Sequence, residues 1–134
     1  MQSLDSLVRH LHLRRGRERR GLALAEGVRL VEEVLAARVP VRAALVAPGL
    51  EATPRGMALA AALRNVAERV ESIGDRELAE LAATDHPQGV VAIIEPPRWT
   101  LEQIAIEPCS VVLLLDAYTL SLHDALPIYR KSVV

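Results

Sequence analysis

The sequence predicts an α/β domain of three layers, in which helices cover both faces of a mostly parallel sheet. Short apolar runs rich in Val and Ile alternate along the chain with segments whose apolar residues recur every three to four positions, which is typical of strands that alternate with helices. The chain has 134 residues, enough for one domain but not for two. Its composition is 51% hydrophobic with one Trp, two Tyr and no Phe, so the predicted core is aliphatic.

The N-terminal segment predicts an amphipathic helix that runs into a charged arm. Ser3 is a suitable helix cap. Four apolar residues then share one helical face: Leu4, Leu7, Val8 and Leu11. Five arginines follow, interrupted by one glycine and one glutamate: Arg14, Arg15, Arg17, Arg19 and Arg20. We expect residues 1–21 to form a helix and an arginine-rich arm.

A strand-helix-strand unit is predicted next. Residues 22–25 form the expected first strand, and apolar positions within 28–35 share one face of the expected helix. Pro40 marks the end of this helix, because a proline ring clashes with the preceding turn. The β-branched run 41–46 then predicts the second strand.

The alternation continues in the second half of the domain. Thr53 followed by Pro54 predicts the start of a helix that extends to about residue 67. A short strand is expected near Val70. Asp75 is a candidate N-cap for a further short helix that ends near residue 81.

The last predicted strand precedes a stiff connector. A turn-rich loop over residues 84–89 leads into the continuous apolar run 90–94, which indicates a strand buried on both faces. Pro96 and Pro97 then stiffen the chain. A further apolar run at 111–115 could begin a new unit.

The positive charge of the chain is concentrated near its N-terminus. The formal net charge is -1, but residues 1–30 contain seven arginines and three acids, whereas the remainder contains nine cations and fourteen acids. An arginine guanidinium can pair bidentately with phosphate or stack on a base. The arm could therefore contact phosphates or be a solvated helix end, and its composition alone favours neither.

Composition excludes several classes of protein. Cys109 is the single cysteine, so no internal disulfide can form, and no Cys and His residues have the spacing of a zinc site. No apolar run approaches the roughly 18 residues of a membrane span, and the N-terminus lacks the pattern of a secretory signal. We expect no metal, no membrane partner and a cytoplasmic location.

Two segments resemble a known family. Residues 17–33 resemble the start of the substrate-binding domain in SpoU (TrmH-like) RNA 2′-O-ribose methyltransferases. Residues 84–92 resemble the loop and strand that close that domain, and Pro96-Pro97 with Trp99 fall where its linker begins. The resemblance covers roughly residues 8–116 and implies an L30e-like fold.

The resemblance implies an RNA-binding domain that works beside a catalytic one. In such proteins the domain engages ribosomal or transfer RNA, while a following knotted α/β domain binds S-adenosylmethionine, transfers the methyl group and usually forms a homodimer. Residues 111–116 resemble the first strand of that knotted domain. After Asp116 the sequence departs from the family, so no catalytic and no cofactor-binding residue can be carried over. The fragment is expected to be catalytically incomplete.

The C-terminal segment has a separate interpretation. Residues 118–128 resemble the translation of a common sequencing adapter, which predicts a non-native tail. The expected organisation is a helix and arm at 1–21, an RNA substrate-binding domain at 22–95, a linker at 96–110, the first strand of a truncated catalytic domain at 111–116 and the tail at 117–134.

The candidate RNA-binding residues are the five arginines of the arm together with Arg29 and Gln88. For Arg29 the alternative is an ion pair with Glu33 at i,i+4. For Gln88 it is a structural role at a loop-strand junction. The Glu26-Gly27 dipeptide could present backbone amides to a phosphate, and the alternative is a tight turn at Gly27 with Glu26 complementing the helix dipole.

Two other functions stay open at this point. One is a free-standing L30e-like RNA-binding protein with no enzyme attached. The other is a protein-interaction module that does not bind RNA. The coding sequence beyond Asp116 separates the first from a methyltransferase, and an RNA titration tests the second.

Overall fold

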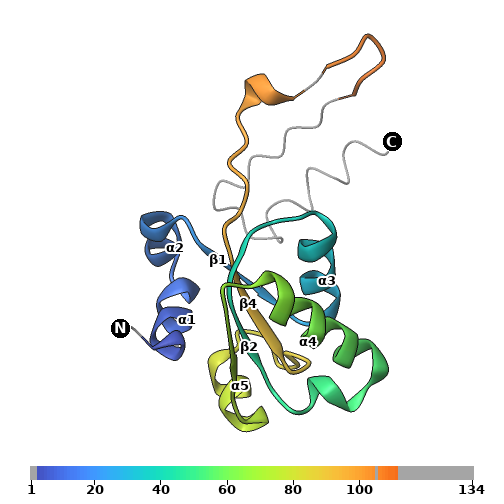
Figure 1. Cartoon of the computed structure of the whole chain (residues 1–134). Coiled ribbons are helices and arrows are strands. Elements are labelled where there is room, and N and C mark those ends of the chain that lie inside the picture. The colour runs from blue at the N-terminus through green and yellow to red at the C-terminus, as the bar shows by residue number, and fades with distance from the viewer. Residues whose placement is uncertain (1–2, 105, 112–134) are drawn as a thin grey trace, which may run out of the picture. The chain divides into compact units, whose positions relative to one another are not determined.

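The computed structural model describes residues 3–104 and 106–111 and divides the chain after Arg98 into two units. The first unit contains every α-helix and β-strand of the described residues (Figure 1). In the second unit the described residues form one 3₁₀ turn, Leu101–Gln103. Apart from Val111, which is exposed, the predicted strand at 111–116 and the tail at 117–134 lie outside the described residues.

The predicted helices and strands of the first unit are confirmed, and the arginine-rich arm is itself a helix. In chain order the elements are α1 (Leu4–His12), α2 (Arg14–Arg20), β1 (Ala23–Glu26), α3 (Val28–Ala36), β2 (Val41–Val46), the 3₁₀ turn η1 (Leu50–Ala52), α4 (Pro54–Val66), β3 (Arg69–Ser72), α5 (Asp75–Leu81) and β4 (Val90–Ile94).

The four strands form one mixed sheet in the order β1-β4-β2-β3. β2 pairs with β3 in parallel, but β4 pairs antiparallel with both β1 and β2. The prediction of a mostly parallel sheet is therefore wrong in its pairings. Helices α3 and α4 return the chain so that β1, β2 and β3 run in one direction, whereas β4 inserts between β1 and β2 in the opposite direction.

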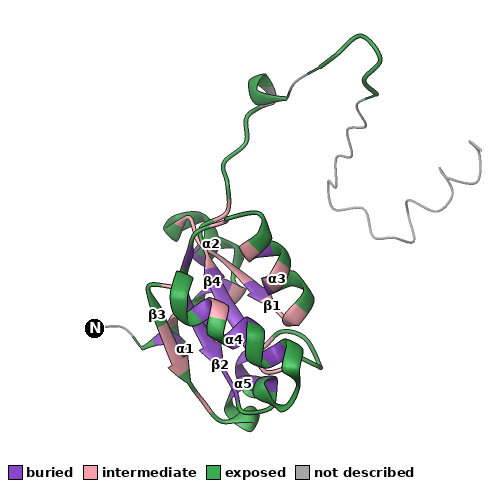
Figure 2. Ribbon diagram, turned by 45° about the vertical axis from the view of Figure 1, so that its right-hand side comes forward, coloured by how far each residue is buried: buried purple, intermediate pink, exposed green. Residues whose placement is uncertain are grey.

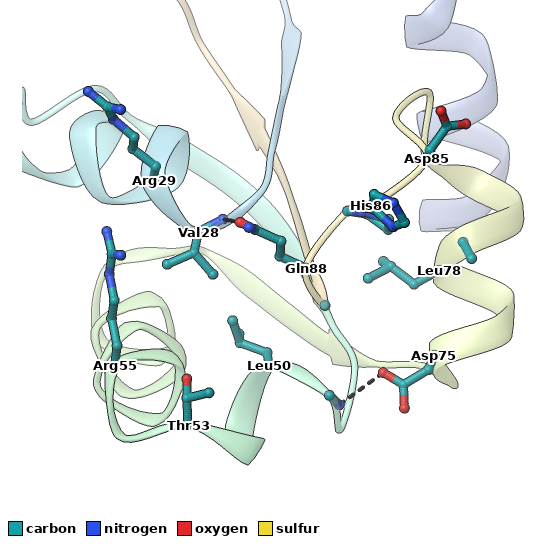
Figure 3. Close-up of a pocket in the computed structure, with 14 residues that line it drawn as sticks. Val28, Arg29, Leu50, Thr53, Arg55, Asp75, Leu78, Asp85, His86 and Gln88 are labelled. Atoms are coloured by element: carbon teal, nitrogen blue, oxygen red, sulfur yellow. Dashed lines mark hydrogen bonds between the residues drawn. The ribbon is translucent and has the colours of Figure 1, made fainter.

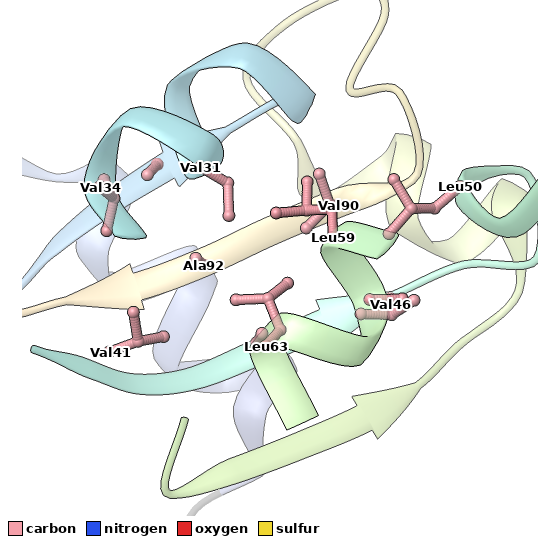
Figure 4. Close-up of a cluster of buried hydrophobic side chains, with 12 residues drawn as sticks. Val31, Val34, Val41, Val46, Leu50, Leu59, Leu63, Val90 and Ala92 are labelled. Atoms are coloured by element: carbon pink, nitrogen blue, oxygen red, sulfur yellow. The ribbon is translucent and has the colours of Figure 1, made fainter. Parts of the chain in front are cut away.

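Two aliphatic clusters pack on opposite faces of this sheet and confirm the three layers. One lies under α3 and α4 and includes Val31, Leu63 and Val90 (Figure 4). The other lies under α1 and α5 and includes Leu11, Leu45 and Ile93. Strands β2 and β4 are buried along most of their length (Figure 2). No polar or charged residue is buried in the described ranges, so hydrophobic burial is the main stabilising term.

Side-chain caps position the helices, with one correction to the sequence analysis. The Ser3 hydroxyl accepts a hydrogen bond from the Ser6 amide at 3.3 Å, and Thr53 Oγ1 accepts one from the Gly56 amide at 3.0 Å. Asp75 is not the N-cap of α5, because Gly74 occupies that position. The Asp75 carboxylate instead accepts a hydrogen bond from the backbone N–H of Gly49 at 2.9 Å, which ties α5 to the turn after β2.

Among the residues described, no helix combines the length and apolarity needed to cross a bilayer.

Candidate nucleic-acid interface

Helix α2, which carries the arginine-rich arm, packs directly against the end of α1. Leu13 is the C-cap of α1 and the N-cap of α2, so the chain changes direction at this residue. Gly16 is buried, and a Cβ atom built on it would lie only 2.0 Å from the carbonyl oxygen of His10. Only a glycine allows the two helices to approach so closely.

Arg17 also holds α2 against α1. Its guanidinium Nη1 donates to the carbonyl oxygens of Leu11, at 3.1 Å, and His12, at 2.7 Å. These carbonyls belong to the last turn of α1, which cannot bond them within the helix. At the other end of α2, Gly21 has a φ of 64° and its N–H donates to the Arg17 carbonyl. The arm is a positioned helix with one arginine in a structural role.

The remaining arginines of α2 differ in their partners. Arg14 Nε donates to Glu18 Oε1 at 2.7 Å, and this hydrogen bond raises the pKa of Arg14. Arg20 is exposed and has an interaction within the protein. Arg15 and Arg19 are exposed, and within the described ranges neither forms an ion pair. These two guanidinium groups, which we call the Arg15/Arg19 pair, are available for a phosphate.

A second polar surface lies where α3, α4 and α5 begin. A cavity of about 820 Å³ opens there between the helix starts and the loop at 84–89 (Figure 3). Arg29 and Arg55 stand on its α3 and α4 side, while Asp85 and His86 stand on the side of α5. With Asp75 also in the lining, two arginines face two aspartates. This surface has much less positive charge than α2.

Gln88 has a structural contact in this cavity. Its backbone φ is 52°, and its side-chain Oε1 accepts a hydrogen bond from the Val28 amide at 3.0 Å (Figure 3). Val28 is the first residue of α3, and the N-cap before it, Gly27, has no side chain to accept this hydrogen bond. Gln88 therefore caps α3 from 60 residues away, which supports a structural role for this residue at the loop-strand junction. Its contact with RNA stays a prediction.

The arginines near the cavity are engaged by acids. Arg29 Nε lies 3.6 Å from Glu33 Oε1, the i,i+4 pair that the sequence offered as an alternative. Arg55 Nε donates to Glu32 Oε1 at 2.8 Å, and this hydrogen bond lowers the pKa of Glu32. Both arginines therefore have a partner within the protein, unlike the Arg15/Arg19 pair.

The structure does not bring the seven candidate residues into one surface. Helix α2 precedes β1 and helix α3 follows it, so the arginines of α2 and Arg29 lie beyond opposite ends of this strand (Figure 1). β1 has four residues, and a strand rises by about 3.3 Å per residue, so roughly the length of this strand separates the two surfaces. Arg29 lies near the start of α3, which follows β1, so it belongs to the surface at the other end of this strand.

Sequence reasoning missed the role of Glu26, at the end of β1. Its carboxylate accepts hydrogen bonds from the backbone amides of Ala83 and Thr84 and from the Thr84 hydroxyl. The carboxylate therefore holds the loop that follows α5 and does not serve α3 alone. Gly27 has a φ of 89°, which confirms the predicted tight turn. No local pattern could reveal a partner 57 residues away.

Within the part of the chain that is described, no group of three or more His, Cys, Asp or Glu side chains could hold a metal ion.

Comparison with known proteins places the chain in a family. The family model of the MRM3-like substrate binding domain matches residues 7–92, more than half of the chain. No curated protein matches the chain significantly.

Solved structures share the fold. An RNA 2′-O ribose methyltransferase is 28% identical, with a TM-score of 0.64 over 82% of this chain and 41% of that one. The SpoU methyltransferase AviRb from Streptomyces viridochromogenes, in complex with AdoMet, is 25% identical, with a TM-score of 0.60 over 79% and 38%. An rRNA methyltransferase from Sinorhizobium meliloti is similar in fold alone, at 20% identity and a TM-score of 0.57 over 78% and 38%.

The chain spans about two fifths of the length of these solved structures. The matched residues 7–92 contain both segments that resemble the SpoU substrate-binding domain, and that resemblance is confirmed. The chain therefore belongs to the family of MRM3-like substrate binding domains.

Proposed function

We propose that this chain is the RNA-binding part of an RNA 2′-O-ribose methyltransferase that acts on ribosomal or transfer RNA. The match of the MRM3-like substrate binding domain over residues 7–92 carries the proposal. The fold shared with an RNA 2′-O ribose methyltransferase at 28% identity supports it. In the whole enzyme, S-adenosylmethionine would supply the methyl group in a further domain, through which two copies would associate.

The resemblance carries no cofactor-binding residue over to this chain, and Asp75, one of the two aspartates that line the 820 Å³ cavity, is already bound to the Gly49 amide. We therefore assign no step of methyl transfer to this chain. Its contribution is to bind RNA and to orient it.

The Arg15/Arg19 pair would contact RNA phosphates, with Arg14 and Arg20 beside it on the same helix. Each phosphate that a guanidinium neutralises releases counterions, so affinity from such contacts falls steeply as salt rises. Arg17 would act indirectly, because its guanidinium is bound to α1. Packing against α1 holds α2 in place before RNA arrives, which lowers the entropic cost of binding.

Arg29 and Gln88 would form a second, weaker contact at the opposite end of β1. Arg29 is highly exposed, and its 3.6 Å contact with Glu33 is long enough for a phosphate to compete. Gln88 would act by holding the start of α3, which carries Arg29. A long RNA could reach both surfaces, whereas a short one would reach only α2.

The test is a titration of the full chain with a fluorescein-labelled structured fragment of ribosomal RNA, at salt concentrations from about 50 to 200 mM. We expect binding that weakens with salt. The slope of log K against log salt concentration should become shallower by about 0.9 for each phosphate contact that is lost in Arg15→Gln, in Arg19→Gln and in the double variant. Arg76→Gln is the matched control, since Arg76 is an exposed arginine on α5. No binding at low salt, or equal binding by the double variant, would refute the proposal.

A second experiment concerns the attached enzyme. The coding sequence of the native gene beyond Asp116 should continue into a catalytic domain with an Asn-x-Gly motif, as the resemblance implies. The match to about two fifths of each solved structure favours this outcome. A stop codon directly after Asp116 would instead favour a free-standing RNA-binding protein.

A further inference from the structure

A small hollow lies at the junction of α1 and α2, away from the cavity at the helix starts. Its volume is about 330 Å³, and its lining residues are His10, Leu13, Arg15, Gly16 and Arg19. The volume is at the lower end of the range of small-ligand sites, about 300 to 1,000 Å³. The hollow can hold one small chemical group, but it is too small for a nucleic-acid double helix.

Leu13 gives the hollow an apolar wall. The residue is 62% exposed even though it joins two packed helices. The backbone of Leu13 serves both helices as a cap, and its side chain belongs to neither core cluster. The exposed ring of His10 stands beside it, with Cδ2 only 2.9 Å from the position of a Cβ on Gly16. A leucine and an imidazole offer a flat base an apolar contact.

The Arg15/Arg19 pair gives the hollow its charge. The two residues are four apart in α2, a spacing at which like charges repel and destabilise the helix. Arg14, by contrast, has Glu18 at the same spacing. In the described residues no carboxylate relieves the repulsion between Arg15 and Arg19 by forming an ion pair. A bound anion would relieve it.

The hollow is preformed. Gly16, one of its lining residues, lies where the backbones of α2 and α1 meet, and Arg17 fixes the two helices to each other. Binding would therefore order only the ends of two arginine side chains.

We propose that this hollow binds a single unpaired nucleotide of RNA, with its phosphate between the guanidinium groups of Arg15 and Arg19 and its base against Leu13 and His10. The inference rests on the proposed RNA-binding function and adds what that RNA must contain. A base stacked within a duplex cannot reach a leucine side chain, whereas a bulged or loop base can. An RNA that bound through its phosphates alone would leave the apolar side chain of Leu13 without a contact.

The test compares two fluorescein-labelled hairpin RNAs that differ only by one bulged nucleotide, each titrated with the full 134-residue chain. We expect roughly five- to tenfold tighter binding of the bulged hairpin, the low end of what one stacked base contributes. Leu13→Ser should remove this preference and leave the affinity for the unbulged hairpin unchanged. Val66→Ser is the matched control, because Val66 is 57% exposed on α4 and should keep the preference.

A second measurement needs no variant. In the wild-type chain, the amide NMR signals of Gly16 and Arg19 should shift more with the bulged hairpin than with the unbulged one. Equal binding of both hairpins, or a preference that survives in Leu13→Ser with an unchanged circular dichroism spectrum, would overturn the inference while the RNA-binding function stands. Failure of the wild-type chain to bind either hairpin would refute the RNA-binding function itself.

Discussion

Glu26 and Thr84, 58 residues apart in the sequence, are joined by two hydrogen bonds. Glu26 Oε2 accepts one from the Thr84 amide at 3.2 Å and one from the Thr84 hydroxyl at 3.1 Å. Both carboxylate oxygens also accept from the Ala83 amide at 3.1 Å. One side chain at the end of β1 thus holds the loop between α5 and β4, which borders the cavity at the helix starts.

Glu26→Gln should destabilise the fold. An amide keeps one acceptor oxygen and turns an N–H₂ group toward donors, so we expect a free energy of unfolding lower by about 1–3 kcal/mol, as for hydrogen bonds to charged groups. Urea unfolding measures the loss, and amide hydrogen exchange should accelerate at Ala83 and Thr84. Glu80→Gln is the control, because Glu80 belongs to an exposed pair with Arg76. Equal stability of the two variants would show that the Glu26 contacts contribute nothing.

Gly16→Ala should separate α2 from α1. A methyl group at this position would lie 2.0 Å from the His10 carbonyl oxygen, which belongs to backbone and cannot rotate away. Overpacking of this kind costs about 1–3 kcal/mol. Thermal unfolding followed by circular dichroism measures it, and the amide NMR signal of His10 should move. Glu18→Ala places the same methyl group on the exposed side of α2 and should leave the His10 signal in place. An unshifted His10 signal in Gly16→Ala would contradict the packing.

Gln88→Met should weaken the start of α3. Methionine has a similar size but no oxygen to accept the Val28 amide, and loss of a helix cap costs about 1 kcal/mol. Gln88→Glu keeps an acceptor and adds negative charge at a helix N-terminus, so it should retain the stability of the wild type. Urea unfolding compares the three proteins. A stable Gln88→Met would mean that the Val28 amide finds another partner.

The Glu32–Arg55 pair should make stability depend on pH. The hydrogen bond from Arg55 holds the pKa of Glu32 below its ordinary value of 4.5. Because the folded-state pKa is the lower one, the contribution is present above the ordinary value and is lost as pH falls through the folded-state pKa. An NMR titration should show the pKa of Glu32 rising toward 4.5 in Arg55→Gln and unchanged in Arg42→Gln, since Arg42 pairs with Glu68 and Glu95. An unchanged value in Arg55→Gln would contradict the pairing.

Local sequence signals located most elements correctly. The run 90–94 coincides with β4, and the run 41–46, which is apolar except for Arg42, coincides with β2, because short apolar runs bounded by turn residues favour buried strands. Ser3 and Thr53 act as the expected caps, since a hydroxyl before a helix bonds amides only three residues away. The N-cap of α5 was predicted one residue too late, at Asp75, because a sequence pattern does not show that the Asp75 carboxylate binds the amide of Gly49, 26 residues earlier.

The candidate site was only partly visible in the sequence. The arginines of α2 and Arg29 are close in the sequence, and their charge alone suggested one patch. In the structure β1 lies between α2 and α3, so these arginines stand near opposite ends of this strand. The hollow beside Leu13 could not be predicted either. In the sequence Leu13 is an ordinary apolar residue, and only the structure shows that it is exposed.

By itself, the sequence determined the alternation of strands and helices, the three layers, the charge of α2 and the family of the chain. These properties depend on neighbouring residues and on periodicity, which are written in the order of the amino acids. Only the tertiary structure decided the direction of β4 in the sheet, the partners of Glu26 and Gln88, and the separation of α2 from Arg29. Each of these depends on contacts between residues distant in sequence, which form only when the hydrophobic layers pack together.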